Sequence, residues 1–82
     1  MLKRWVMANT KESFGGRLAR CRKSAGWSQG QLAESSGVHC VTISRLERNR
    51  SSPDFETLVA LSKALGVAAG FLAAPLLRGG GR

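Results

Sequence analysis

The chain contains two short helical patterns that lie close together in sequence. The first begins at Ser28, where Ser28 and Gln31 have the spacing of a capping box, in which each side chain bonds to the backbone of the other residue. Gly37 ends this pattern, because glycine adopts the left-handed backbone of a helix end at little cost. The second pattern covers residues 39–48. A link of about three residues that contains a glycine predicts two helices that cross steeply.

Three further segments have the apolar spacing of helices. They cover residues 13–25, about 54–65 and 68–74; Asp54 caps the second, and Pro75 is expected to end the third. The predicted inward residues are Phe14, Leu18, Cys21 and Ala25 in the first, Phe55, Leu58, Val59, Ser62 and Leu65 in the second, and Phe71 and Leu72 in the third. No segment alternates as a strand does. The sequence therefore predicts an all-α fold, a compact bundle of five short helices.

The length of 82 residues leaves room for one small domain. We expect this domain at residues 13–77, between a flexible basic arm at 1–12 and a disordered glycine-rich tail at 78–82. The longest uncharged stretch, 64–77, is shorter than the roughly 18 residues of a membrane span, and the start lacks the apolar region of a secretory signal. The two cysteines form neither a disulfide framework nor a metal-ligand pattern, so we expect reduced thiols, a cytoplasmic protein and no metal.

The net charge of +8 is unevenly distributed along the chain. Positive charge gathers in residues 1–23 and again in 45–50, on either side of a nearly neutral stretch. Arg17, Arg20 and Lys23 lie largely off the apolar face of the first helix. A solvated basic surface is one interpretation of these clusters, and a surface that binds the phosphates of a nucleic acid is the other.

Several motifs agree in register with a known family. Five of them lie between residues 26 and 48: Ser28-Gln29, Leu32-Ala33, Gly37-Val38, Thr42-Ile43-Ser44 and Leu46-Glu47. Pro53 to Leu58 and Ala64 to Val67 continue the pattern. Over about residues 13–74 the chain thus resembles the lambda-repressor/Cro-like (XRE) family of helix-turn-helix DNA-binding domains. The resemblance implies that the second and third helices form the helix-turn-helix, and that the helix at about 39–48 enters the major groove of DNA.

Base contacts are expected on the outer side of the helix at 39–48. The residues on the side away from Ile43 and Leu46 are Cys40, Val41, Ser44 and Arg45. Arg45 can donate two hydrogen bonds to one guanine, and the small apolar side chains of Cys40 and Val41 suit a thymine methyl group.

Phosphate contacts are expected around both helices of the motif. The resemblance implies that Gln29 binds a phosphate, assisted by the positive end of its helix. The full expected set is Ser28, Gln29, His39, Thr42, Arg48, Asn49 and Arg50. The resemblance also implies an ion pair between Arg22 and Glu47. His39 stands where the family has a capping Ser or Thr, so we expect this helix to be poorly capped.

These features predict a transcription regulator that binds a specific sequence of double-stranded DNA, as a stand-alone repressor, a controller or an antitoxin. One small domain reads few bases, so we expect a homodimer. Its expected interface residues are Phe71, Leu72, Leu76 and Leu77. A toxin is a further partner to expect if the chain is an antitoxin.

Other functional classes receive less support. The alternative is a protein-interaction module of the same fold with an incidental basic surface. A third hypothesis is redox sensing through Cys40, because a thiol near a helix start and arginines is easily ionised. The chain has no nucleophile–base pair and no glycine-rich loop that could cradle a phosphate, so neither an enzyme nor a cofactor is expected.

Overall fold

Local capping signals set the helix boundaries. The structure, a computed structural model, describes residues 12–80. Within this range it has five helices and no strand: α2 (Phe14–Ser24), α3 (Gln29–Ser36), α4 (Cys40–Glu47), α5 (Phe55–Leu65) and α6 (Ala69–Gly80). The predicted all-α class is therefore confirmed. The expected arm lies almost entirely in residues 1–11, outside the described residues, and so do the last two residues of the expected tail.

The helix caps follow the sequence pattern. The hydroxyl oxygen of Ser13 accepts a hydrogen bond from the Gly16 N–H, and the Asp54 carboxylate accepts one from the Thr57 N–H. The capping box at the start of α3 is complete, because Ser28 and Gln31 each bond to the backbone of the other. Gly37 ends α3 with a φ of 80°, in the left-handed region that was predicted for it. These local interactions satisfy backbone groups that a helix end leaves without partners.

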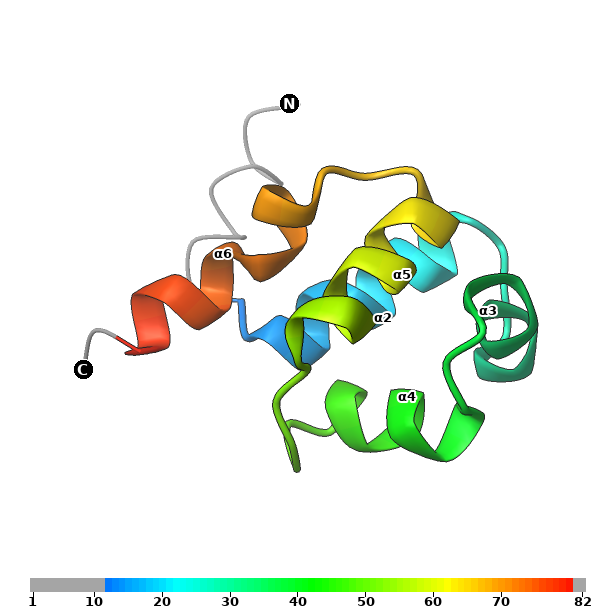
Figure 1. Cartoon of the computed structure of the whole chain (residues 1–82), viewed down its shortest axis with the longest axis horizontal. Helices are drawn as coiled ribbons and strands as arrows, with labels where there is room; N and C mark the ends of the chain where they lie inside the picture. Colours follow the sequence, from blue (N-terminus) through cyan, green and yellow to red (C-terminus); the bar gives the residue numbers. More distant parts are fainter. Residues whose placement is uncertain (1–11, 81–82) are drawn as a thin grey trace.

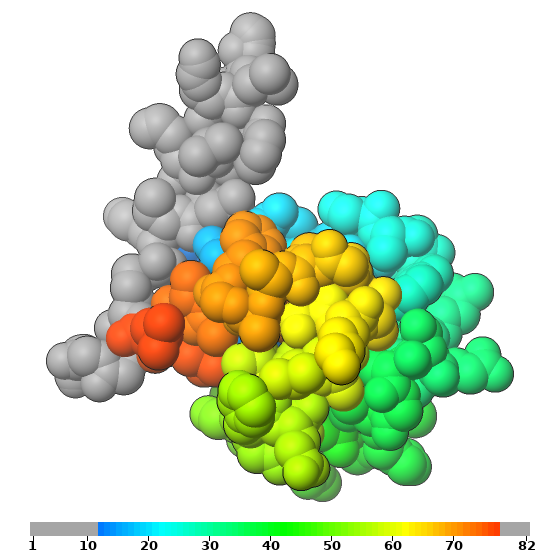
Figure 2. Space-filling view, turned by 45° about the horizontal axis from the view of Figure 1, so that its top comes forward, coloured from blue at the N-terminus to red at the C-terminus, as the bar shows by residue number. Residues whose placement is uncertain are grey.

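The helices pack in a closed arrangement around one core. α2 contacts α4 and α6, α5 contacts α3 and α6, and α3 contacts α4. Figure 1 shows α4 along one edge of the molecule, with α3 and α6 on opposite sides of the fold. Figure 2 shows α5 and the first half of α6 side by side. The buried apolar residues are Phe14, Leu18, Leu32, Ile43, Leu46, Leu61 and Leu72. In α4 the buried residues are Ile43 and Leu46, so the core holds this helix by one side and leaves the other side to solvent.

Gly15 allows α2 and α4 to approach closely. A methyl group at this position would lie 2.5 Å from the carbonyl oxygens of Leu46 and Glu47. Such a distance is far inside van der Waals contact, so any larger residue would push the two helices apart. The glycine therefore sets how closely α4 sits against the rest of the fold.

The predicted end of the last helix is wrong. α6 continues beyond Ala74 through Pro75 to Gly80, so part of the expected tail is helical. A proline inside a helix lacks the N–H that would bond to the carbonyl four residues earlier, here that of Phe71. In this structure Arg17 donates to that carbonyl from Nη1, at 2.8 Å. The tertiary contact replaces the missing helical bond and allows α6 to pass the proline.

Several predicted positions need correction. Ala25 and Phe71 were predicted to point inward, but both are exposed, and Ala25 lies just after the end of α2. Phe55 was placed on the apolar side of its helix, but it is 76% exposed because it is the first residue of α5 and no element covers it. On the same helix, Leu61 is fully buried, although it was not among the predicted inward residues. Arg17 was placed off the apolar face of α2, yet it is only 6% exposed. Its guanidinium is satisfied by polar partners, among them the Glu12 carboxylate. Glu12 itself was assigned to the arm and instead bonds to α2.

Candidate nucleic-acid interface

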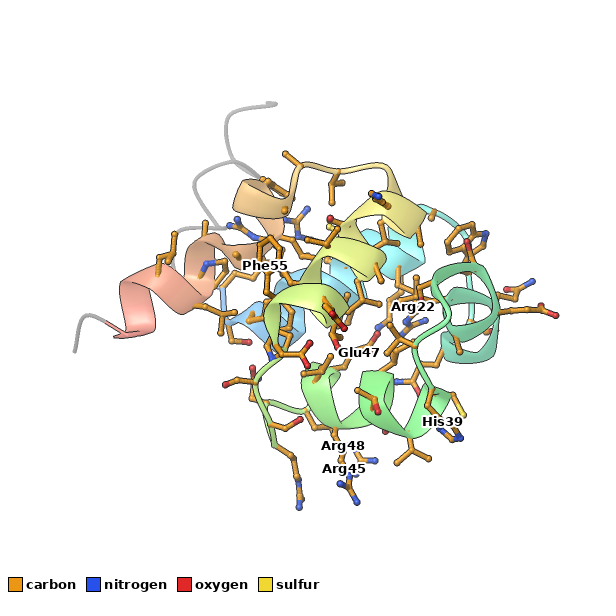
Figure 3. All side chains as sticks on the ribbon, in the orientation of Figure 1. Arg22, His39, Arg45, Glu47, Arg48 and Phe55 are labelled. Carbon is orange, nitrogen blue, oxygen red and sulfur yellow. The ribbon has the colours of Figure 1, made fainter. Side chains whose placement is uncertain are left out.

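α4 presents one polar side to solvent. Ile43 and Leu46 are buried, and the predicted base-contact residues lie mostly on the opposite side. Cys40, Val41 and Arg45 are exposed, whereas Ser44 and Thr42 are partly buried. Figure 3 shows the labelled side chains of His39, Arg45 and Arg48 projecting from α4 toward the same edge of the molecule. The structure therefore brings most of the predicted base contacts and part of the phosphate set onto one surface.

The start of α4 is better capped than expected. His39 was predicted to cap poorly, but its Nδ1 atom accepts a hydrogen bond from the Val41 N–H at 3.1 Å. An unprotonated ring nitrogen is an acceptor and can take the role of a Ser or Thr oxygen. A charged imidazole would donate from both nitrogens and could not make this bond. The predicted contact of a charged His39 with phosphate would therefore be made at the expense of the cap.

Arg48 is held along the outer side of α4. Its Nη2 atom donates a hydrogen bond to the Ser44 hydroxyl oxygen at 2.7 Å. The two residues are four apart, the spacing at which side chains meet on a helix surface. The bond still leaves the hydroxyl proton of Ser44 and further N–H groups of Arg48 as donors. Both residues thus keep the chemistry that their predicted DNA contacts require.

Asn49 attaches the loop after α4 to the start of α2. Its backbone has a φ of 58°, in the left-handed region that asparagine adopts more readily than most residues. Its Oδ1 atom accepts a hydrogen bond from the Gly15 N–H at 3.0 Å, and its Nδ2 atom donates to the Ser13 hydroxyl at 3.1 Å. The sequence predicted a phosphate contact here and did not indicate this structural role. Arg48 and exposed Arg50 thus flank a residue that anchors their loop.

Arg22 and Glu47 form the expected ion pair. The carboxylate accepts from Arg22 Nε at 2.7 Å and from Nη2 at 3.0 Å, and Arg22 Nη1 also donates to the Trp27 carbonyl oxygen at 2.9 Å. Gln29 donates from Nε2 to the same carboxylate at 2.9 Å. Figure 3 shows Arg22 and Glu47 inside the angle between α3 and α4. The network joins α2, α3 and α4, and it fixes the amide of Gln29, a predicted phosphate ligand.

The ion pair keeps Glu47 ionised. Burial by itself would raise the pKa of this carboxyl group, but the hydrogen bonds from Arg22 and Gln29 outweigh it and lower the pKa below its usual value. The same bond to Glu47 raises the pKa of Arg22. The charge of Arg22 is therefore balanced within the fold.

Glu12 balances further positive charge on α2. It accepts hydrogen bonds from Arg17 at 2.9 Å and from Arg20 at 2.6 Å. The bond from Arg20 is the largest influence on the Glu12 carboxyl group, and its pKa is lowered. Part of the basic cluster at residues 1–23 is thus structural. Among the described residues, the exposed arginines of α4 and its following loop are well placed to face a polyanion.

The expected dimer surface is smaller than the sequence indicated. Phe71 is 41% exposed and Leu77 is 73% exposed, so both can meet a partner. Leu72 is fully buried, and Leu76 is partly buried against the same core. Leu72 was expected at the interface, but it belongs to the core because it lies on the side of α6 that packs inward. Phe71 and Leu77 remain as the exposed apolar residues of the set.

Other kinds of site find little support between residues 12 and 80. No three side chains of His, Cys, Asp or Glu gather there in a way that could hold a metal ion. None of the helices in this range is long and apolar enough to cross a membrane. Cys40 is exposed at the start of α4, and Cys21 is partly buried.

Comparison with known proteins gives consistent matches. The helix-turn-helix family matches residues 18–72. The chain is 41% identical over 59 residues to the SPbeta prophage-derived uncharacterized HTH-type transcriptional regulator YonR of Bacillus subtilis (strain 168), covering 72% of this chain and 55% of that protein. It is 36% identical over 61 residues to the HTH-type transcriptional regulator SutR of Escherichia coli (strain K12), covering 74% and 34%. The chain thus spans about half or less of the length of these relatives.

Solved structures show the same fold. The P22 c2 repressor protein in complex with synthetic operator 9T is similar with a TM-score of 0.71 and 38% identity, over 74% of this chain and 92% of that chain. The DNA-binding domain of the P22 c2 repressor in solution gives a TM-score of 0.72 and 36% identity, over 77% and 83%. Both likenesses extend over most of the residues that the structure describes.

Proposed function

The chain belongs to the helix-turn-helix family, and we propose that it is a transcription regulator that binds a specific sequence of double-stranded DNA through α4. The solved relative in complex with its operator supports this function. The observation that carries the proposal is the outer surface of α4. It combines the small exposed side chains of Cys40 and Val41 with Arg45, while the inner side of the helix is held in the core.

The chemistry of this surface fits the major groove of DNA. Arg45 can donate two hydrogen bonds to the edge of one guanine, and Val41 can contact a thymine methyl group. Arg48 and Arg50 are placed to bind phosphates beside the groove, which fixes the position of α4 without reading sequence. Gln29, held by Glu47, is the proposed phosphate ligand from α3.

We extend the proposal to a homodimer, because one such domain reads few bases. Exposed Phe71 and Leu77 on α6 support this assembly. A regulator of this kind works where its DNA is, so we propose the cytoplasm as its location.

Selection of duplexes from a random pool is the first test, since it yields a preferred site and its half-site spacing. On that site, Arg45→Ala should lose about 1–3 kcal/mol of discrimination at one base pair. Lys63→Ala is the matched control, because it removes an equal charge from an exposed position on α5. Titration of binding with salt should show a steep fall in affinity for the wild type.

The same experiment separates the two leading hypotheses. If no sequence is enriched and Arg45→Ala binds all duplexes as the wild type does, the protein-interaction module becomes the better explanation. Arg48→Ala and Arg50→Ala should weaken binding to all sequences about equally and reduce the salt slope by about one each. That pattern would assign these two residues to phosphates.

A further inference from the structure

We propose that Arg17 is a positioning residue that fixes α6, and with it the dimer surface, by donating the hydrogen bond that Pro75 cannot. The inference rests on the homodimer proposed above. It concerns a side chain on α2 that lies far in sequence from the helix it would control, and that neither the basic surface of α4 nor the apolar core explains.

Pro75 leaves one carbonyl oxygen of α6 without its usual helical donor. Pro75 has no N–H, and its ring crowds the carbonyl group of the residue four positions earlier, which is Phe71. This carbonyl oxygen therefore cannot accept the usual helical bond. An unpaired buried carbonyl costs stability, and a helix with an interior proline tends to kink or break.

Arg17 supplies a donor for this carbonyl oxygen. Arg17 Nη1 lies 2.8 Å from the Phe71 carbonyl oxygen, and its donor is charged, which strengthens the bond. The same guanidinium lies over the Phe71 ring, with 4.5 Å from Cζ to the ring centre, in the geometry of a cation–π contact. Glu12 accepts from Arg17 Nε at 2.9 Å and so fixes the plane of the guanidinium.

The residue that Arg17 contacts belongs to the proposed dimer surface. Arg17 holds both the backbone and the ring of Phe71, which is one of the two exposed apolar residues of α6. Leu77, the other, lies beyond Pro75 and depends on the continuity of the helix. A surface that is already ordered loses less conformational entropy when a partner binds. Arg17 therefore orders Phe71 directly and Leu77 through the continuity of α6.

The experiment compares Arg17→Met with Arg20→Met. Both arginines lie on α2 and bond to Glu12, but the contacts with Phe71 belong to Arg17. Sedimentation equilibrium of the full chain should show the dimer dissociation constant of Arg17→Met raised about tenfold, because a less ordered α6 loses more conformational entropy when the partner binds. Arg20→Met should dimerise like the wild type. Affinity for a duplex with a single half-site should be similar in all three proteins.

A second substitution tests the mechanism. Pro75→Ala returns an N–H that can bond to the Phe71 carbonyl, so Arg17→Met/Pro75→Ala should recover most of the lost dimerisation. Hydrogen exchange should agree. The amides after Phe71 should exchange faster in Arg17→Met than in the wild type, and the double variant should return toward the wild-type rates. If Arg17→Met is too unstable to study, Arg17→Lys provides a milder loss, with the same rescue expected. Unchanged exchange in the single variant, or absence of rescue, would overturn the proposal.

These measurements keep the two proposals apart. If the wild type stays monomeric in solution and on a two-half-site duplex, the homodimer is wrong and Arg17 positions no dimer surface. Hydrogen exchange would then still show whether Arg17 replaces the bond that Pro75 lacks. If the wild type dimerises but Arg17→Met dimerises equally well, only the role of Arg17 fails.

Discussion

Glu47 connects three helices through one carboxylate. It accepts hydrogen bonds from Arg22 on α2 and from Gln29 on α3, while it is itself the last residue of α4. Its side chain is 8% exposed, so little water can replace a lost partner. Removal of one member of a buried pair leaves the other charge without compensation, which is more costly than the pair was worth. The residue thus controls both the stability of the fold and the placement of Gln29.

Glu47→Gln should lower the free energy of unfolding at neutral pH by roughly 3 kcal/mol, because the charge of Arg22 then stays buried without its partner. The folded protein lowers the pKa of Glu47 from an ordinary value of 4.5. The carboxylate therefore contributes stability that is fully present above that value and is lost as the pH falls through the lower, folded pKa.

Urea unfolding at a series of pH values would measure this. The difference between the wild type and Glu47→Gln should shrink in the acid range, whereas the exposed Glu34→Gln should match the wild type at neutral pH. If the difference in the free energy of unfolding stays constant into strong acid, Glu47→Gln destabilises the protein through altered packing and not through the lost charge.

At the scale of whole helices, the position of α4 depends on contacts at its C-terminal end. Gly15 lets the backbones of α2 and α4 approach, and Asn49 then bonds to the Gly15 N–H and the Ser13 hydroxyl from the following loop. The Gly15 N–H belongs to the first turn of α2, where no helical partner exists. One asparagine thus caps α2 and anchors the loop that holds Arg48 and Arg50.

Gly15→Ala should destabilise the protein by about 1–3 kcal/mol, since a methyl group there would overlap backbone oxygens that cannot rotate away. It should also weaken DNA binding by moving α4. Gly30→Ala is the matched control on α3. Its added methyl group would meet only the Ser28 hydroxyl at 3.8 Å, and alanine favours the helix by about 1 kcal/mol over glycine. Thermal unfolding should show opposite signs for the two substitutions, and the same sign would contradict the close contact.

Boundaries that depend on neighbouring residues could be predicted from the sequence. Ser28, Gln31 and Gly37 define α3 through interactions within a few residues, and these are present. Pro75 was expected to end the last helix. The sequence does not show that Arg17, which lies on the first of the five helices, would donate the missing hydrogen bond to the Phe71 carbonyl. Apolar spacing placed Phe55 on an inward face, but spacing cannot reveal that no element covers that end of α5.

The site was predictable to a similar degree. The motif placed Arg45 and Val41 on the outer side of α4 because helical periodicity and the buried Ile43 fix which side faces out. It did not show that Gln29 bonds to Glu47 or that Asn49 bonds to α2. Both interactions join elements that are separate in sequence, and their polar side chains could equally have faced solvent.

At the scale of the molecule, the exposed aromatic and leucine side chains Phe55, Phe71 and Leu77 lie on other elements than the exposed arginines of α4 and its following loop. Glu12 and Glu47 balance arginines of α2 within the fold, while α4 and the loop after it carry exposed arginines. The large exposed apolar residues include Leu77 at the far end of α6 and Phe55 at the start of α5. A solvent-exposed apolar patch often marks a contact with another protein. The molecule therefore offers two places where a second copy could bind.

We expect Leu77→Glu to weaken dimerisation and Phe55→Glu to leave it unchanged, because the proposed interface lies on α6. The two side chains are exposed to nearly the same extent, 73% and 76%, so the substitutions are well matched. Glutamate at the first position of α5 also suits the positive end of the helix, and it should not destabilise the fold. Sedimentation equilibrium would decide. A loss of dimer in Phe55→Glu alone would move the interface to α5.

The attachment of α3 and α4 to α2 has a consequence for protein engineering. Glu47 reaches Arg22, and Asn49 reaches Ser13 and Gly15, so the two-helix motif cannot be transplanted into another scaffold as an autonomous segment. A graft that lacks these acceptors and donors would carry a buried charge and an unsupported loop. If α4 binds DNA as proposed, a change of the preferred DNA sequence should exchange the outward side chains of α4 and leave its inner hydrogen bonds unchanged. The rest of the domain holds α4 in place, and only the outward side chains of α4 can be exchanged freely.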